Sequence, residues 1–297
     1  MEHVNLSGMG VALITPFQTN GEVDYPALSR LVDCLLQNDT DYLVVLGTTA
    51  ETPALSPSEQ KEIIRFVIEK VKKQIPIVLG VSGNNTNAVI EQLKTRDLKG
   101  IDAILSVVPY YNKPSQEGIY QHFKAIAQAT SLPLVLYNVP GRTGTNMTAE
   151  TTLRLARDCH NVIATKEASG NLVQIGTIIK YKPAGFQVIS GDDGITFPLI
   201  ALGAVGVITV TGNAFPKEFG RMVHLALSGD YANALSLHNS FLEIFELLFT
   251  DGSPAGVKSF LNMMGRIENV LRLPLVPVQN TTSEKIRNEL QKLKIKN

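Results

Sequence analysis

The sequence predicts an α/β fold, a (β/α)8 TIM barrel followed by a C-terminal three-helix extension. Three observations predict it: eight short apolar segments recur up to residue 213, helix-period segments separate them, and the recurrence stops near Ser228. Runs of Val, Ile and Leu without polar alternation are typical of parallel strands covered on both faces. Eight regularly spaced units favour a closed barrel over an open sheet.

The expected strands each end in small or polar residues. In chain order they are GVALITPF (10–17), YLVVLG (42–47), PIVLGVSG (76–83), AILSVVP (103–109), LPLVLYNVP (132–140), VIATKEAS (162–169), FQVISGDD (186–193) and GVITVTGN (206–213). Among the helices between them, the one after Ser56-Pro57-Ser58-Glu59 has the clearest start, because this segment contains the elements of a capping box. A Rossmann-like sheet is the alternative, but the near match to its fingerprint around Gly8 and Gly10 precedes a strand.

Two regions are expected along the chain. Residues 1–228 form the barrel, and residues 229–297 form three helices separated by 252–254 and by 273–280. Because the second region is short, we expect it to pack on the barrel or on a neighbouring subunit.

Composition limits the classes of function. The 27 Lys+Arg balance the 27 Asp+Glu, so no charge excess attracts nucleic acid or an anionic membrane. The N-terminal residues lack the pattern of a signal peptide, and no apolar stretch reaches the roughly 18 residues of a membrane span. Cys34 and Cys159 lie in expected helices and indicate neither a disulfide framework nor a thiolate metal site. We expect a cytoplasmic protein.

Lys166 is the strongest candidate for a catalytic residue, since it is the only Lys or Arg within the eight expected strands. A lysine directed inward loses hydration, which lowers its pKa and makes a neutral, nucleophilic amine accessible. That is the requirement for Schiff-base catalysis. The alternative is a lysine that points outward and pairs with Glu167 or a helix carboxylate.

Residues at neighbouring strand ends support this chemistry. Tyr137, on the preceding strand, could move protons during imine formation. Thr48 and Thr49 offer hydroxyls and backbone N–H groups to a small carboxylate, and Arg142 offers a bidentate fork. The simpler alternatives are a core tyrosine, an ordinary turn and a solvated arginine.

Other chemistries are disfavoured. A helix N-cap explains Asp192 and Asp193 better than a metal site does, and the five histidines form no HxxxH or HExxH pair. We therefore expect no metal. The sequence contains neither a serine nucleophile elbow nor a P-loop.

The assembled motifs resemble those of the pyruvate-dependent Schiff-base aldolases, a family that includes dihydrodipicolinate synthase and N-acetylneuraminate lyase. The resemblance covers essentially the whole chain. Its motifs are GTTAE (47–51), PYYNKPSQEG (109–118), YNVPGRTG (137–144), IATKEASGN (163–171), SGDD (190–193) and GVITVTGN (206–213), in the order of the family. The arginine-containing loop is similar to that of the dihydrodipicolinate synthase branch, and the lyase branch lacks it.

The resemblance implies condensation of pyruvate with L-aspartate 4-semialdehyde to 4-hydroxy-tetrahydrodipicolinate, which leads into diaminopimelate and lysine biosynthesis. Lys166 would hold pyruvate covalently as an imine, with no external cofactor. Tyr137, Thr48 and Tyr111 would form a hydroxyl relay. Tyr111 would reach the active site of a neighbouring subunit, which implies a homo-oligomer, in this family commonly a homotetramer built as a dimer of dimers.

The resemblance also implies a set of substrate contacts. Thr48 and Thr49 would hold the pyruvate carboxylate, and Arg142 would bind the carboxylate of the aldehyde. Gly191 and Ile208 would line the pocket through backbone groups.

This chain departs from the family pattern in two places. Ala50 replaces a glycine, which would strain the loop if that position needs a positive φ. The second departure concerns the family's site for feedback inhibition by lysine, where Asn84 and Tyr110 match but four positions differ: Ala88 stands where the family has an acidic residue, and Pro53, Pro57 and Gln60 replace other polar residues. Without that carboxylate the ligand ammonium lacks a charge partner, so we predict weak or absent lysine inhibition. Inhibition at micromolar lysine would contradict this.

Two alternatives stay open. A sister aldolase would form the same imine with another 2-oxo acid, as an N-acetylneuraminate lyase does. A catalytically silent barrel would only bind a small carboxylate.

Overall fold

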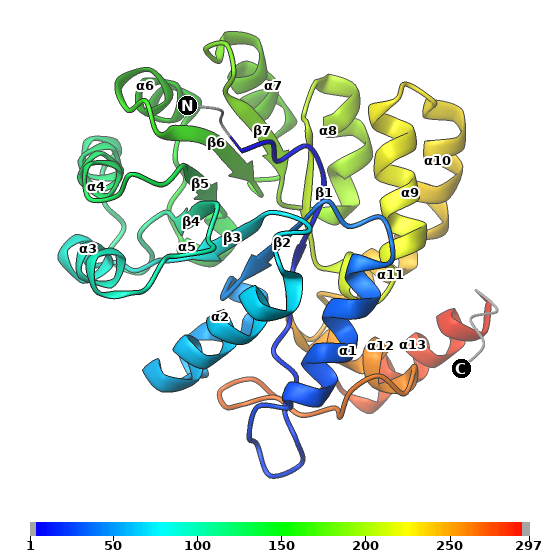
Figure 1. The fold of residues 1–297 in the computed structure, drawn as a ribbon. Coiled ribbons are helices and arrows are strands. Elements are labelled where there is room, and N and C mark those ends of the chain that lie inside the picture. Colours follow the sequence, from blue (N-terminus) through cyan, green and yellow to red (C-terminus); the bar gives the residue numbers. More distant parts are fainter. Residues whose placement is uncertain (1–3, 293–297) are drawn as a thin grey trace.

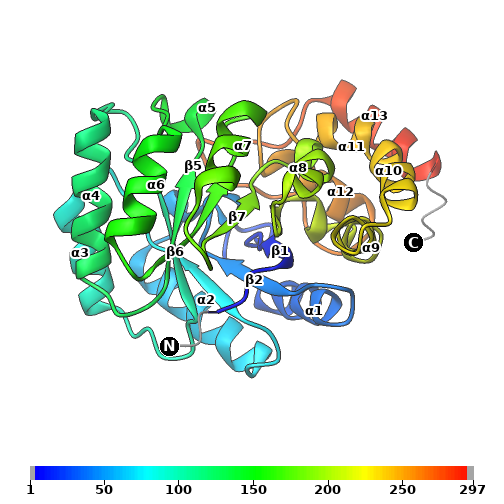
Figure 2. The ribbon, with the colours of Figure 1, turned by 90° about the horizontal axis from the view of Figure 1, so that it is seen from above.

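Eight parallel strands form a closed barrel in which each strand pairs with its neighbours in sequence order, as shown by a computed structural model that describes residues 4–292. Helices surround the barrel (Figure 1, Figure 2). The strands are β1 (Gly8–Ala12), β2 (Tyr42–Val45), β3 (Ile77–Gly80), β4 (Ala103–Val107), β5 (Leu134–Asn138), β6 (Val162–Glu167), β7 (Gln187–Ser190) and β8 (Gly206–Thr209). The predicted (β/α)8 barrel is confirmed.

Helices follow the strands, and all of them except the four-residue α5 are longer than the strands. They are α1 (Tyr25–Leu36), α2 (Pro57–Val71), α3 (Thr86–Thr95), α4 (Gln116–Gln128), α5 (Pro140–Thr143), α6 (Ala149–Asp158), α7 (Leu172–Tyr181), α8 (Thr196–Leu202) and α9 (Pro216–Leu227). Short 3-10 turns follow three of the strands: η1 (Thr48–Ala50), η2 (Thr52–Ala54), η3 (Asp193–Ile195) and η4 (Thr211–Asn213).

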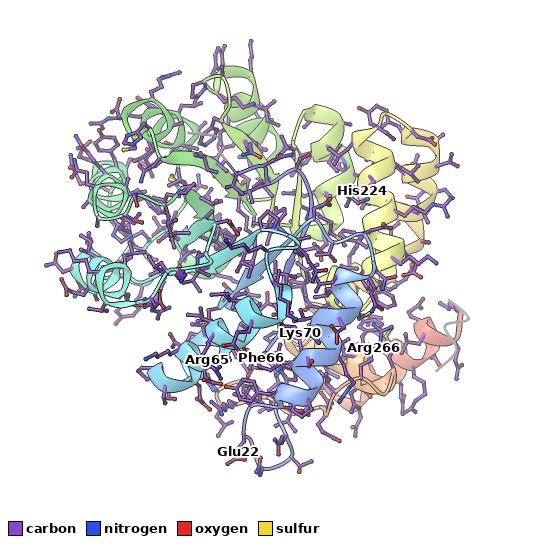
Figure 3. All side chains as sticks on the ribbon, viewed as in Figure 1. Glu22, Arg65, Phe66, Lys70, His224 and Arg266 are labelled. Atoms are coloured by element: carbon purple, nitrogen blue, oxygen red, sulfur yellow. The ribbon has the colours of Figure 1, made fainter. Side chains whose placement is uncertain are left out.

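Helix α2 begins with the predicted capping box. The Ser56 hydroxyl accepts from the Glu59 backbone N–H at 3.3 Å, and the Glu59 carboxylate accepts from the Ser56 N–H at 2.8 Å. Near the end of the same helix, Lys70 Nζ lies 2.6 Å from Asp33 Oδ2 and links α2 to α1 (Figure 3). Both ends of α2 are therefore held by polar contacts.

Strand β1 is shorter than the sequence predicts and begins earlier, at Gly8 instead of residue 10. The apolar residues of 13–17 lie past the strand because their side chains pack in the core. Leu13 and Phe17 are almost completely buried, and the Phe17 ring lies against residues of the C-terminal extension. At these positions, apolar residues indicate burial in the core and not membership of a strand.

The seam between the first and last strands depends on two glycines. Gly8 pairs with Gly206, and a Cβ on Gly206 would lie 2.0 Å from the Gly8 carbonyl oxygen. Gly206 also has a φ of 151°. No larger residue fits at this position, so glycine permits β8 to pair with β1 and close the barrel.

The C-terminal extension is confirmed, but its described part contains four helices instead of three. They are α10 (Tyr231–Ser240), α11 (Leu242–Leu247), α12 (Ala255–Met263) and α13 (Asn280–Lys292). The first expected helix is divided at Phe241, whose φ of −103° and ψ of −2° depart from helical values while its ring packs against Phe215, Phe219 and Phe245. The extension packs on the barrel against α8 and α9 (Figure 1, Figure 2).

The core has two layers. One lies between the strands and the surrounding helices, and the other fills the barrel interior. Large members of the interior layer are Tyr42, Val44, Val78, Leu105, Val135, Ile163, Ile189 and Ile208. This layer is the floor beneath the carboxyl ends of the strands, where barrel enzymes place their reacting groups. Between residues 4 and 292, no helix has the length and apolar character needed to cross a membrane.

Candidate active site

A cavity of about 620 Å³ is lined by side chains that include several at the carboxyl ends of the strands. Its lining contains six of the eight site residues predicted from the sequence, namely Thr48, Thr49, Tyr137, Arg142, Lys166 and Gly191. Segments far apart in the sequence therefore meet at one end of the barrel. Tyr111 and Ile208 are the two predicted residues outside this lining.

Lys166 lies on β6 directly beside Tyr137 on β5, with which it pairs in register. Its Nζ atom is 4.3 Å from the centre of the Tyr137 ring, and only 7% of the residue is exposed. Glu167 is completely buried and bonds residues outside the cavity, because adjacent strand residues face opposite sides of the sheet. The structure thus has the inward lysine, and not the outward alternative paired with Glu167.

Burial lowers the pKa of the Lys166 amine to about 8, because the charged form loses its hydration. The Asp193 carboxylate opposes this shift, and the Arg142 cation adds to it. A substantial fraction of the amine is therefore neutral near physiological pH and available as a nucleophile.

Tyr137 has the opposite shift. Burial raises the pKa of its phenol to about 12, although the Arg142 charge and a hydrogen bond with Thr48 both act to lower it. The phenol is therefore protonated at neutral pH and can donate a proton toward the lysine. Thr48 is its hydrogen-bonding neighbour on the cavity wall.

Thr48 and Thr49 lie in η1, which directly follows β2 after a short bend. Ala50 closes this turn by donating its N–H to the Gly47 carbonyl at 3.2 Å. Ala50 is not among the residues with positive φ, whereas the next residue, Glu51, has a φ of 55°. The family glycine is therefore replaced without the backbone strain that a positive φ would cause.

Arg142 lies in the short helix α5 at the cavity wall, and its side chain is exposed. Among the ion pairs of residues 4–292, none involves Arg142. An exposed guanidinium without a carboxylate partner is suited to bind an anionic group of a substrate.

Behind the cavity, buried polar residues hold the loop that carries Arg142. The Asn138 amide donates to the Glu167 carboxylate at 2.9 Å, and its carbonyl oxygen accepts from the Met147 N–H at 2.9 Å. Ser169 and Gln174 also donate to Glu167. Asn138 is not among the sequence-predicted site residues, although an amide within an apolar strand indicates a buried polar contact.

Gly191 follows β7 and lies close to the lysine. A Cβ at this position would be 2.9 Å from Lys166 Cε, so glycine leaves room for the lysine side chain. Ile208 lies below the cavity in the interior layer of the core, and Val210 is the lining residue at the end of its strand.

Tyr111 is 88% exposed and has a φ of 73°, whereas its neighbour Tyr110 lines the cavity.

Asp192 is the N-cap of η3, as the sequence predicts, since it accepts from the Gly194 N–H at 3.0 Å. Asp193 accepts from Val210 and Thr211 at the start of η4. Burial raises the pKa of both carboxyl groups.

Among residues 4–292, no group of three or more His, Cys, Asp or Glu side chains is placed to hold a metal ion. The four positions that differ from the family's site for lysine lie in η2, α2 and α3. Pro53 and Gln60 line the cavity, Pro57 is the first residue of α2, and Ala88 lies in the first turn of α3. Gln60 accepts from the Arg96 guanidinium at 2.6 Å.

Comparison with known proteins agrees with this geometry. The model of the dihydrodipicolinate synthetase family matches residues 5–293. The chain belongs to this family. It is 69% identical over its full length to the 4-hydroxy-tetrahydrodipicolinate synthase of Parabacteroides distasonis, and 68% identical to that of Phocaeicola vulgatus, with the full length of each relative covered.

A solved structure leads to the same family. The dihydrodipicolinate synthase from Acinetobacter baumannii, in complex with pyruvate, superposes with a TM-score of 0.95 at 39% identity, over 98% of this chain and 100% of that one. Membership makes this chain a lyase of the aldolase type in diaminopimelate and lysine biosynthesis. The comparisons give no support to the N-acetylneuraminate lyase alternative.

Two charged residues that are not among the sequence-predicted site residues are also completely buried. Lys258 in α12 and Glu51 after η1 form an ion pair in which neither side chain is exposed. A signal for Lys258 was present, because the buried apolar residues Val257, Phe260 and Leu261 flank it at helical spacing. No local pattern identifies its partner.

Proposed function

We propose that this chain condenses pyruvate with L-aspartate 4-semialdehyde to 4-hydroxy-tetrahydrodipicolinate through an imine on Lys166. The observation that carries the proposal is the buried Lys166 amine beside the Tyr137 phenol at the wall of the cavity. Family membership supports the choice of substrates. No external cofactor takes part in the reaction that we propose.

The first half of the reaction forms the imine. The neutral Lys166 amine attacks the ketone carbon of pyruvate, and loss of the ketone oxygen as water then gives a C=N bond to Nζ. Tyr137 and Thr48 relay the protons that these steps move. Thr48 and Thr49 hold the pyruvate carboxylate, while Gly191 and the backbone near Ile208 complete the pocket.

The second half forms the carbon–carbon bond. The protonated imine accepts electrons as the pyruvate methyl loses a proton, and the resulting enamine attacks the aldehyde carbon, whose oxygen gains a proton. Arg142 binds the aldehyde's carboxylate. The amine of the second substrate then displaces Lys166 as the ring closes, so Lys166 is regenerated and one water is lost overall.

We propose a homotetramer, a dimer of dimers, in which Tyr111 completes the relay of a neighbouring subunit. The exposure of Tyr111 supports this proposal, because a large aromatic side chain that points away from its own chain can enter the site of a neighbouring subunit. Cytoplasmic localisation is also proposed, and the two free cysteines, Cys34 and Cys159, fit a reducing compartment.

The decisive experiment measures turnover with both proposed substrates, together with borohydride trapping of the pyruvate imine. We expect efficient condensation and one reduced adduct on Lys166, both lost in Lys166→Ala. Cleavage of N-acetylneuraminate is measured under the same conditions. Trapping with cleavage but without condensation would identify a sister aldolase, and no trapping at all would identify a silent barrel.

A further inference from the structure

We infer that Glu51 and Lys258 are positioning residues that fix the turn Thr48–Ala50, so that the C-terminal extension controls how well the chain binds pyruvate. The inference rests on the proposed function, in which Thr48 and Thr49 hold the pyruvate carboxylate. Glu51 follows this turn directly in the sequence, whereas Lys258 belongs to α12.

The contact between them is an ion pair removed from solvent. Lys258 Nζ lies 2.5 Å from Glu51 Oε1, and both side chains have no exposed surface. The second carboxylate oxygen, Oε2, accepts from the backbone N–H of Arg272 at 3.0 Å. Both oxygens of Glu51 are therefore held by the C-terminal extension.

Lys258 is itself held from two further directions. Its Nζ donates to the Val270 carbonyl at 3.0 Å and lies 4.2 Å from the centre of the Phe17 ring. The guanidinium of Arg272 lies 4.4 Å from the same ring centre. Phe17 follows β1, so this cluster joins the loop after β1, the loop after β2 and the extension.

The backbone conformation explains how the contacts of the Glu51 side chain affect the turn Thr48–Ala50. Glu51 has left-handed angles, φ 55° and ψ 35°, which are uncommon for a residue with a side chain. Its N–H donates to the Thr48 carbonyl at 3.2 Å and its carbonyl accepts from Ala54 at 2.8 Å. A change in the direction of the Glu51 side chain would therefore alter the end of the turn.

Arg272 forms a second set of contacts farther along the same loop. Its guanidinium donates to the Ala54 carbonyl at 2.9 Å, to the Gly21 carbonyl at 2.8 Å and to the Glu59 carboxylate at 2.5 Å. The hydrogen bond from Arg272 to the Glu59 carboxylate lowers the pKa of Glu59 to about 2, so this contact persists over the whole neutral range. The loop is thus fixed at both Glu51 and Ala54.

A buried ion pair is a poor source of net stability, because desolvation of both charges offsets their attraction, but it fixes the direction of its partners. Removing the Glu51 charge leaves Lys258 able to become neutral, since burial lowers its pKa to about 8. Glu51→Gln therefore keeps the size of the side chain and leaves no charge that is forced to remain buried without a partner. This variant therefore tests the position of the turn Thr48–Ala50 more than the stability of the fold.

The experiment compares Glu51→Gln and the double variant Glu51→Gln/Lys258→Met with the unaltered chain. We expect the pyruvate concentration for half-maximal borohydride trapping, and the KM for pyruvate, to rise about tenfold, while the KM for aspartate 4-semialdehyde changes less than about twofold. The kcat falls as well, because the turn also carries the Thr48 hydroxyl of the proposed relay. Arg266→Gln is the matched control, because Arg266, labelled in Figure 3, ties the extension to the Ala214 carbonyl at 3.0 Å and does not contact the turn.

Three results would overturn the inference. These are unchanged pyruvate saturation in folded variants, an equal rise in both KM values, and the same rise in Arg266→Gln. If the double variant does not fold, Glu51→Gln and Arg272→Lys give the answer, with circular dichroism to verify their folds. Failure of the unaltered chain to form any pyruvate adduct would instead refute the proposed function.

Discussion

Two charged neighbours, Asp193 and Arg142, act on the Lys166 amine in opposite directions. Since the pKa of Lys166 is about 8, the fraction of neutral amine increases with pH below that value. We expect the kcat/KM for pyruvate to rise about tenfold per pH unit below pH 8 and to level off above it. Stopped-flow kinetics or trapping rates across pH 6–10 measure this dependence.

Arg142 supplies the control for that titration. Its positive charge lowers the pKa of Lys166, so Arg142→Gln should raise this pKa and move the rise in rate to higher pH. A rise centred near pH 10 in the unaltered chain, or no movement in the variant, would contradict the proposed environment of the amine.

Ala50 allows a test of backbone strain. Because it lies outside the positive-φ region and its methyl group is buried, restoring the family glycine relieves no strain and removes apolar contact. We expect Ala50→Gly to lower the free energy of unfolding by about 1–2 kcal/mol. Urea denaturation measures this change, and a gain in stability would show that Ala50 is strained.

The start of α2 depends on the hydroxyl of Ser56, which accepts a hydrogen bond that the first turn of the helix cannot satisfy internally. Ser56→Ala should cost about 1 kcal/mol of stability with little change in kcat. Ser58→Ala is the matched control, because this exposed serine follows in the first turn and its recorded side-chain contact is with Ser56. Equal losses in the two variants would argue against the capping box.

Several elements were predictable because their signals are local. The apolar runs located all eight strands, and Lys166 was conspicuous as a cation within one of them. Strand ends were less predictable, since Leu13, Ile14 and Phe17 are apolar because they pack in the core and not because they pair in the sheet. The division at Phe241 was equally hidden, because it follows from contacts with Phe215 and Phe219 across the fold.

The candidate site was predictable to the extent that each residue lies at a strand end. Thr48, Tyr137 and Lys166 meet in the structure because a barrel brings the carboxyl ends of all strands to one face. The Glu51–Lys258 pair was beyond the sequence analysis. Its members are far apart along the chain, and only the packing of α12 against the barrel end brings them together.

The complete molecule is expected to share residues between subunits. Tyr111→Phe should lower kcat about 100-fold while the oligomer persists, because the relay then lacks one proton-transferring group. Steady-state kinetics and sedimentation velocity measure the two properties. A variant that kept full activity as a dissociated monomer would contradict the shared site.

Mixed oligomers give a sharper version of this test. Lys166→Ala lacks the nucleophile but keeps Tyr111, and Tyr111→Phe has the reverse composition. If the relay crosses the interface, refolding the two variants together should restore activity in hybrids. Each variant alone is the control, and no recovery in verified hybrids would place the tyrosine outside the neighbouring site.

The glycine seam between β1 and β8 has a consequence for how the chain is synthesised. Lys166 and Tyr137 lie on adjacent strands, so a nascent chain could pair them soon after β6 leaves the ribosome. The barrel cannot close until Gly206, in the last strand, pairs with Gly8, in the first strand. Until then β1 has an unpaired edge, and the partly formed sheet is exposed to aggregation.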